Sequence, residues 1–554
     1  MPNKDKLKII PLGGVEEVGK NCTVFEYQND IIVVDLGFDF PNPNFPGVHY
    51  LLPDISYLKN NKEKIRALIL THGHLDHIGA ISYLIRDIGN PPIFGSKLTL
   101  AIVEDRLREK NLDKESNLKE IDSNSIFYFG KFKVNFFRVN HNIPDSFGIA
   151  ISTPLGVIIH ASDFKFDESP VDQQLAEKNK LKEYAKDGVL LLLSSSTNAD
   201  VPGKAISEKK VGQMIDSIFN KIKGRILFTT FSTLISRIYQ VIESCQKYQR
   251  KIVVFGLSSR KNIRIASDLG YLKVPPGLFI KPEEIKKFRD QELLFLVSGS
   301  QGTEGSAMSR IAKKEFHSFK IKPGDTVVFS SSAIPGNEIA IYEMMNNLVD
   351  QGAEIIYEPI LGLGIHSSGH APAEDLKEII NLTKPQFFIP IHGDHYLQAY
   401  HIKLAEEVGL RRENIFMLHN GDVLEIDKDK KPKILPQRVT KFSLIVEGEK
   451  VKTFPPKIFE ERKRLAENGI CVLKILGKKK NFFVKIKFYG LTIEKNIIKE
   501  IEKKAIKLYK THAIKKGSAP EGHPPRRDID NWIEMSLTDF ILSKTGKRPL
   551  TIVM

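Results

Sequence analysis

Short apolar runs alternate with polar turns along the first part of the chain. Such runs, bounded by turn residues, predict strands. A longer pattern of helical period covers residues 78–88. Strands interspersed with helices predict an α/β sandwich for residues 1–206. The expected strands are residues 8–11, 23–27, 31–35, 67–70, 132–138 and 157–159.

The pattern changes at about residue 207 to longer helices and strands in alternation. Helices are expected at 208–221 and 234–247, and strands at 225–229 and 251–255. This order predicts a parallel-sheet domain, placed at 207–365. Residues 366–450 return to short strands, such as 387–391 and 423–426, and are expected to complete the first domain.

The last part of the chain has a third pattern. The stretch KTFPPK indicates a linker at 451–460, and a separate αβ domain is expected at 461–554. Gly and Pro residues in GSAPEGHPPRR, at 517–527, interrupt this domain. Its expected elements are strands at 470–476 and 482–488 and helices at 493–509 and 529–544.

Composition narrows the class of protein. Hydrophobic residues make up 41% of the 554 positions and charged residues 27%, which is ordinary for a folded globular protein and excludes a disordered one. No apolar run is long enough for a signal peptide or a membrane span. A cytoplasmic protein without a membrane partner is therefore expected.

Cysteine usage limits the kind of metal site. The chain has three cysteines, Cys22, Cys245 and Cys471, far apart in sequence. They allow neither a disulfide framework nor a Cys-based zinc cluster. Any metal must be held by histidine and carboxylate.

The charge is strongly positive. Lys and Arg number 82 against 67 Asp and Glu, a net +15, and residues 461–554 hold 22 against 10, a net +12. A positive surface attracts RNA or DNA through counterion release and steering. A general lysine bias explains the charge equally well.

The segment THGHLDHIGA carries the sharpest chemical signal. His72, His74, Asp76 and His77 directly follow the apolar run ALIL and precede a helical pattern. In a turn between strand and helix these side chains can point into one cavity. Imidazole and carboxylate are ligands that Zn²⁺ prefers.

Three more candidates each follow an expected strand. They are His141 in RVNHNIPDS, Asp163 in IIHASDFKFD and His392 in FFIPIHGDH. Taken singly, His141 and His392 are more often ordinary polar residues than ligands. Their order along the chain reverses that interpretation.

The motif HxHxDH and the ordered set after it resemble the metallo-β-lactamase superfamily. The resemblance implies an αββα sandwich that binds two divalent ions per subunit, zinc in the first place and manganese as the alternative. It assigns His72, His74 and His141 to one ion. It assigns Asp76, His77 and His392 to the other, with Asp163 as the bridge and Asp76 counted among the catalytic residues. Such metal pairs suit phosphodiester hydrolysis.

The inserted domain and the segment IHSSGHAPAED resemble the β-CASP branch, whose characterised members act on nucleic acids. Within it, GGVEEVGKN at 13–21, SGSQGTEG at 298–305, SSAIPGNE at 331–338 and SKTGKRPL at 543–550 resemble the ribonuclease J family. His370 is implied as a catalytic residue that binds the phosphate or protonates the leaving oxygen. The implied substrate-binding residues are His366, Ser367, Ser368, Gly369, His370, Ser232 and Thr233.

The chain also departs from the family pattern. Ser195, in LLSSSTNAD, stands where the family usually has Asp, and such partners of ligand histidines influence metal affinity and activity. Leu75 replaces a Glu inside the HxHxDH motif, and SDFKFD replaces GDFKFD. HGDHY at 392–396 replaces HGE followed by an aromatic residue and Arg.

The expected function is therefore a ribonuclease with 5′-to-3′ exonuclease and endonuclease activity in RNA maturation and decay. The resemblance implies a 5′-monophosphorylated RNA substrate. It also implies a homodimer, a homotetramer or a heteromer with a paralogue. Two alternatives stay open: a catalytically weakened RNA-binding subunit, suggested by Ser195, and a small-molecule esterase or lactonase on the same scaffold.

Overall fold

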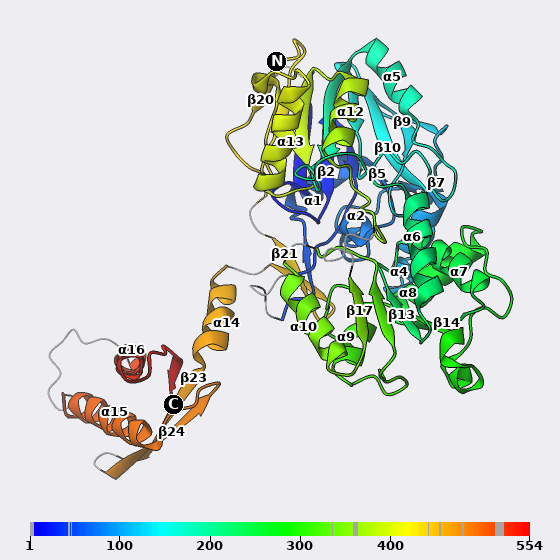
Figure 1. The fold of residues 1–554 in the computed structure, drawn as a ribbon. Helices are drawn as coiled ribbons and strands as arrows, with labels where there is room; N and C mark the ends of the chain where they lie inside the picture. Colours follow the sequence, from blue (N-terminus) through cyan, green and yellow to red (C-terminus); the bar gives the residue numbers. More distant parts are fainter. Residues whose placement is uncertain are drawn as a thin grey trace. The chain divides into compact units, whose positions relative to one another are not determined.

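The computed structural model divides the chain into two compact units. The first comprises Met1–Phe40 and Tyr50–Val446, and the second Pro41–His49 and Glu447–Met554. Figure 1 shows the elements of each unit. Within the described residues, no helix is both long and apolar enough to cross a membrane. The structure describes residues 5–41, 45, 47–334, 336–357, 364–440, 443–453, 456–478, 481–515 and 526–554.

Two sheets form the larger domain of the first unit. The eight-stranded sheet consists of β1 (Leu7–Gly13), β2 (Cys22–Tyr27), β3 (Asp30–Val34), β5 (Ile65–Ile69), β6 (Ile93–Gly95), β7 (Leu118–Glu120), β19 (Leu424–Ile426) and β20 (Pro432–Ile434). The six-stranded sheet consists of β8 (Ile126–Phe129), β9 (Phe132–Val139), β10 (Ser146–Thr153), β11 (Gly156–His160), β12 (Val189–Ser195) and β18 (Phe387–Ile391). Their orders are β20-β19-β1-β2-β3-β5-β6-β7 and β18-β12-β11-β10-β9-β8.

The inner faces of the two sheets share one hydrophobic core. Phe25 and Ile69 of the first sheet lie in it together with Ile149 and Ile389 of the second. On its outer face the second sheet packs against α5 (Lys178–Asp187), α12 (Ala373–Thr383) and α13 (His395–Glu407). On the first sheet, α4 (Lys97–Glu109) contacts β6 and β7. This αββα order confirms the expected fold class.

Strands from the segment that follows the inserted domain complete both sheets. β18 pairs with β12, placing Ile389 opposite Leu193. β19 pairs with β1, placing Leu424 opposite Ile9. Residues far apart in the chain therefore become neighbours within both sheets. A further short pair joins β4 (Tyr50–Leu52) to β21 (Leu444–Glu447).

The inserted domain is built on a five-stranded parallel sheet of order β14-β15-β13-β16-β17. Its strands are continuous apolar runs, as expected for a sheet that is covered on both faces. They are β13 (Ile226–Thr229), β14 (Lys251–Phe255), β15 (Leu293–Val297), β16 (Thr326–Phe329) and β17 (Glu354–Tyr357). One face packs against α6 (Glu208–Lys221), α7 (Ile235–Lys247) and α8 (Leu257–Asp268). The other packs against α9 (Ala307–Ala312) and α10 (Glu338–Val349).

The helix expected at 78–88 is wrong in its extent. The structure has two single turns instead, α2 (Leu75–Ile78) and α3 (Ile81–Leu84). The break has a tertiary cause, because the Ala80 N–H donates to the Leu36 carbonyl at 3.1 Å and not to a carbonyl of its own helix. A Cβ on Gly79 would lie 2.3 Å from the Phe38 ring. Close contact with the loop after β3 therefore decides the path of the chain between α2 and α3.

The second unit has its own small sheet and core. In the sheet, β23 (Ile470–Lys478) pairs antiparallel with β24 (Asn481–Tyr489) and parallel with β25 (Leu550–Val553). Leu473 packs with residues of α15 (Lys495–Lys515) and α16 (Arg526–Thr545). The expected linker 451–460 contains the end of β22 (Lys450–Thr453) and the start of α14 (Pro456–Asn468). The helix can begin at a proline because proline is compatible with a first helical turn. Most of the expected break at 517–527 lies outside the described residues.

Candidate metal centre

Four ligand-type side chains lie between the end of β5 and the end of α2 (Leu75–Ile78). β5 is almost entirely buried and ends at Ile69, so the polar residues emerge at its carboxyl end. His72 precedes the turn, His74 caps α2, and α2 itself carries Asp76 and His77. His72 and His77 are buried, and the other two are partly exposed.

The other three candidates come from the second sheet. His141 follows β9, Asp163 follows β11 and His392 follows β18, and all three are buried. β11 and β18 both run parallel to β12, which lies between them, so their carboxyl ends meet at one sheet edge. The structure thus brings all seven residues into two groups of potential ligand atoms.

The first group consists of three imidazoles. His72 Nε2 and His141 Nε2 each lie 3.0 Å from His74 Nδ1. A tetrahedral cation about 2.0–2.1 Å from each nitrogen would place neighbouring nitrogens roughly 3.3 Å apart. The spacing of these rings therefore suits one bound metal ion.

The second group combines imidazole and carboxylate around Asp163. Its Oδ2 lies 3.0 Å from His77 Nε2, and its Oδ1 lies 2.7 Å from His392 Nδ1. His392 Nε2 lies 3.3 Å from Asp76 Oδ2. Asp163 Oδ2 also comes within 3.9 Å of His72 Nε2, which places this carboxylate between the two groups.

The donor set fits divalent cations on two further grounds. The Nε2 of His392 is buried and, although Asp76 Oδ2 lies 3.3 Å away, makes no well-aligned hydrogen bond to any described residue. The set of five imidazoles and two carboxylates consists of ligand types preferred by zinc and comparable first-row metals. Together with the superfamily match reported below, the cluster indicates a metal site.

A buried carboxylate that the sequence interpretation missed, that of Asp35, orients a ligand ring. Asp35 Oδ2 accepts from His77 Nδ1 at 2.8 Å, which leaves His77 Nε2 facing Asp163. The same carboxylate accepts the Thr71 N–H and hydroxyl, both at 2.8 Å. Such outer partners fix the tautomer of a ligand histidine. The available signal was a charged residue ending the apolar run IIVVD.

Electrostatics keep the carboxylates of the cluster ionised. Burial alone would raise the pKa of Asp163, but the nearby His392, His370 and His77 hold this pKa well below its usual range. Burial would also raise the pKa of Asp76, and His77 and His392 again lower it. The imidazole of His72 has a pKa well below its usual value because it is buried beside other histidines. Ionised carboxylates and the neutral His72 ring are forms that bind metal. Burial would lower the pKa of His392, but Asp163 and Asp76 raise it to about 9, so metal binding at this ring must release a proton.

His370 lies beside the cluster. Its Nδ1 is 3.8 Å from Asp163 Oδ2, and its ring centroid is 5.2 Å from that of His141. Burial lowers the pKa of His370 to about 4, so the ring is neutral near pH 7. His141, Asp163 and His370 also form a group that could share a cation. Geometry therefore allows His370 to be either a ligand or a group facing the substrate.

The loop before His370 supports the cluster through its backbone and hydroxyls. The Gly369 carbonyl accepts from His141 Nδ1 at 2.7 Å, which turns His141 Nε2 toward the other imidazoles. Ser368 Oγ accepts the His370 N–H at 3.2 Å. His366 is buried, and its Nε2 is 3.5 Å from Ser332 Oγ.

A buried ionic network joins this loop to the inserted domain. Lys165 Nζ donates to Glu208 Oε1 and to Ser367 Oγ, both at 3.0 Å. Arg237 donates to Glu208 Oε2 at 2.9 Å and to the Ile365 carbonyl at 2.6 Å. Lys165 follows Asp163 by two residues, so the network links the cluster to the first residue of α6 and to α7.

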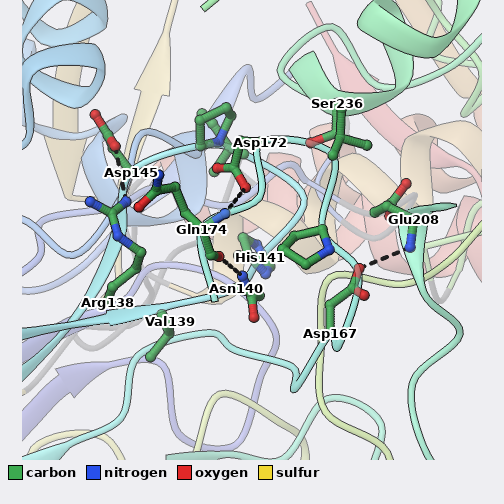
Figure 2. Close-up of a pocket in the computed structure, with 14 residues that line it drawn as sticks. Arg138, Val139, Asn140, His141, Asp145, Asp167, Asp172, Gln174, Glu208 and Ser236 are labelled. Atoms are coloured by element: carbon green, nitrogen blue, oxygen red, sulfur yellow. Dashed lines mark hydrogen bonds and ion pairs between the residues drawn. The ribbon is translucent and has the colours of Figure 1, made fainter. Parts of the chain in front are cut away.

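A polar pocket borders His141 (Figure 2). Asp145 pairs with Arg138 at 3.2 Å, and Asp167 accepts the Glu208 N–H at 2.8 Å. Both carboxylates therefore already have an ion-pair or hydrogen-bond partner in the protein. The pocket lining thus connects the strand before His141 to the start of α6.

Ser195 faces a ligand histidine. Its Oγ lies 3.4 Å from His392 Nδ1, as does the hydroxyl of Thr197. Asp200, which could have supplied a replacement carboxylate, is exposed. Leu75 begins α2, and its carbonyl accepts the Phe38 N–H at 3.2 Å.

Ser232 and Thr233 are half-buried in the turn after β13. The Ser232 carbonyl accepts from Asn262 Nδ2 at 3.0 Å. The neighbouring Phe231 ring lies 6.4 Å from His366, centroid to centroid. A substrate role for the two hydroxyls stays a prediction.

Three family models match parts of the chain. Residues 15–138 match the metallo-beta-lactamase superfamily, and residues 223–348 match the ribonuclease J beta-CASP domain. Residues 364–418 match the Zn-dependent metallo-hydrolase RNA specificity domain. The last match contains His366, His370 and His392.

Similar proteins cover nearly the whole chain. A ribonuclease J from Synechocystis sp. is 37% identical over 99% of this chain and 86% of its own length. A ribonuclease J from Thermus thermophilus is also 37% identical, over 99% of this chain and 95% of its own length. A crystal structure of a protein of unknown function from Enterococcus faecalis shares the fold, with a TM-score of 0.55 at 18% identity over 76% of this chain and 100% of that one.

Proposed function

This chain belongs to the ribonuclease J family, and from that premise we propose that it is a metal-dependent ribonuclease that hydrolyses RNA phosphodiesters at the cluster around Asp163. The observation that carries the proposal is the convergence of seven potential ligands into two adjacent groups. One of the seven, His392, and the neighbouring His370 lie in the segment 364–418 that matches an RNA specificity domain. The match and the geometry together favour RNA over a lactone or a small ester.

In the proposed site, His72, His74 and His141 would hold one divalent ion. Asp76, His77 and His392 would hold a second, and the Asp163 carboxylate would be available to both. When bound, such a pair supplies Lewis acidity that lowers the pKa of water and stabilises charge on attacking and leaving oxygens at phosphorus. Zinc is the first candidate by ligand chemistry, with manganese as the alternative.

The protein's own groups position the reactants. Asp35 and the Gly369 carbonyl hold His77 and His141 in the tautomers that present Nε2 to the cluster. His370, neutral and partly exposed, is placed to donate a hydrogen bond from its ring N–H to the phosphate, and it could deliver a proton to the leaving oxygen only from its protonated form. Hydroxyls and backbone N–H groups of residues 366–370, with those of Ser232 and Thr233, bind the neighbouring phosphates.

We assign both cutting modes, 5′-to-3′ exonucleolytic and endonucleolytic, with 5′-monophosphorylated RNA as the preferred substrate. The test uses purified full-length protein with 5′-monophosphorylated, 5′-triphosphorylated and circular RNAs, with and without chelator. Mononucleotides released from the monophosphorylated RNA indicate exonuclease activity. Internal fragments from circular RNA indicate endonuclease activity.

The variant for this test is the double change His74→Ala with Asp76→Ala, which removes one potential ligand from each group. Hydrolysis should be abolished while fold and RNA affinity persist, because affinity comes from basic contacts elsewhere. Circular dichroism and filter binding check the two retained properties. Hydrolysis by the chelated double variant would rule out the metal-dependent mechanism.

The alternative of a weakened RNA-binding subunit rests on Ser195, which stands beside His392 in place of a carboxylate. It predicts RNA binding without cleavage of any of the three RNAs, even after addition of zinc or manganese. Cleavage that depends on added metal excludes this alternative.

A further inference from the structure

A second, separate group of ligand-type side chains lies on the first unit. Glu16, His395 and His419 each offer one ligand atom, and these atoms lie within 4.8 Å of one another. Glu16 Oε1 is hydrogen-bonded to His419 Nδ1 and lies 3.3 Å from His395 Nε2. The two imidazole centroids are 5.0 Å apart. None of the three is among the residues assigned to the cluster around Asp163.

The three side chains come from distant parts of the chain that the fold holds firmly together. Glu16 lies in the loop after β1, His395 begins α13, and His419 precedes β19. The Asn420 N–H donates to Glu16 Oε2 at 3.0 Å, and Asn420 Nδ2 donates to Glu17 at 3.0 Å. The other carboxylate oxygen of Glu16 is thereby aimed at the two imidazoles.

The backbone conformation of Glu16 also indicates that its position is fixed. Its φ of 66° lies in the left-handed region, which residues with a side chain rarely adopt. Such conformations persist where surrounding contacts impose them. The loop is fixed by Gly14, whose carbonyl accepts the His392 N–H at 2.5 Å, and by a bridge between Glu17 and Gly393.

We propose that Glu16, His395 and His419 form an additional transition-metal site, distinct from the cluster around Asp163, that takes Zn²⁺. Two imidazoles and a carboxylate are a three-ligand zinc set. Two imidazole donors disfavour Mg²⁺ and Ca²⁺, which prefer oxygen. The side chains of His395 and His419 are 45% and 40% exposed, so water can complete the coordination.

One of the three residues departs from the pattern that the resemblance implies. His395 stands where the resemblance to the ribonuclease J family implies an aromatic residue after HGE, whereas Glu16 belongs to the segment GGVEEVGKN that resembles this family. An ion here would join the loop after β1 to the start of α13, next to the Gly14–His392 contact. Occupancy should therefore stabilise the fold around His392.

The test measures zinc stoichiometry on metal-free full-length protein by competition with a chromophoric chelator of micromolar affinity. His395→Phe and His419→Ala should each bind one Zn²⁺ fewer than the wild type. His317→Ala, which removes an exposed histidine of the inserted domain, is the matched control and should keep the full number. Zinc should also raise the thermal midpoint less in His395→Phe than in the control.

The same zinc measurement on a second parent protein distinguishes a failure of this proposal from a failure of the proposed function. In the double variant His74→Ala with Asp76→Ala, the additional site should still bind one zinc ion, and adding His395→Phe should abolish that binding. Equal zinc numbers in the wild type, His395→Phe and His419→Ala would show that the three residues form only an ion pair. This result would overturn the proposal without touching the assignment of the cluster around Asp163.

Discussion

At the scale of single residues, His370 is the group whose role geometry leaves open between metal ligand and substrate contact. The change His370→Ala should lower turnover at least about tenfold, because general acid–base or phosphate-binding groups contribute roughly two to four orders of magnitude. Bound metal should stay constant, because the seven ligands do not include this ring. Single-turnover RNA cleavage and metal analysis on the same sample measure both quantities.

A loss of bound metal in His370→Ala would contradict this prediction. It would make His370 a ligand in the group that it forms with His141 and Asp163. His370→Gln, which keeps a hydrogen-bonding amide, is the matched control for phosphate contact. Partial recovery of the rate in His370→Gln is expected.

Ser195 raises a separate question, since its hydroxyl faces His392 Nδ1 at 3.4 Å. Ser195→Asp should increase metal affinity or turnover by up to about 10- to 100-fold, the range for carboxylates that orient ligand histidines. Metal titration of RNA hydrolysis by wild type and variant side by side measures the gain. The uncharged Ser195→Asn separates charge from size.

An unchanged titration in Ser195→Asp would mean that Asp163, already 2.7 Å from His392 Nδ1, satisfies the ring. A new buried carboxylate then adds desolvation cost without benefit. Ser195 would become a neutral difference from the family. The argument for a weakened subunit would lose its main support.

At the scale of elements, α6 is anchored to the cluster by its first residue. Glu208 pairs with both Lys165 and Arg237, and all three side chains are buried. Glu208→Gln leaves two buried cations without their anion, which typically costs about 3–5 kcal/mol. We expect a clear fall in the thermal midpoint together with slower RNA cleavage, because Ser367 shares Lys165.

Glu374→Gln is the control for this prediction. Glu374 is also an acidic residue in the first turn of a helix, α12, but it is exposed and pairs with Lys377 at 3.1 Å on the surface. Its replacement should change stability by less than about 1 kcal/mol. Similar effects of both changes would refute a special role for the network.

At the scale of the whole molecule, the second unit is predicted to serve assembly and RNA contact. It has its own core, so a chain ending at Val446 retains the cores of the sandwich and the inserted domain. The truncated chain should form smaller oligomers and bind RNA with a weaker salt dependence, because the net +12 of residues 461–554 is lost. Light scattering and binding at several salt concentrations measure these effects.

A full-length charge variant distinguishes the two roles of the second unit. Lys503, Lys507 and Lys510 are exposed on α15, and their replacement by Gln should lower the salt dependence without changing oligomer size. Truncation that changed neither property would contradict the assignment.

The sequence alone determined the local chemistry and most of the elements. Apolar runs ending in His or Asp predicted the strands before His72, His141, Asp163 and His392, because strand burial and strand length leave a periodic signature. The number of cysteines excluded thiolate sites. The α/β class followed from the order of these elements and the αββα sandwich from the resemblance of the motifs, and the family model matches and 37% identity to ribonuclease J proteins agree with both.

Only the tertiary structure decided which residues meet. Asp35 supports His77 across 42 positions of the chain, and Glu16 reaches His419 across 403. The expected helix at 78–88 divided because Leu36 took the N–H of Ala80. In each case the partner lies on a strand or loop made adjacent by sheet order, and neither periodicity nor spacing along the chain encodes that adjacency.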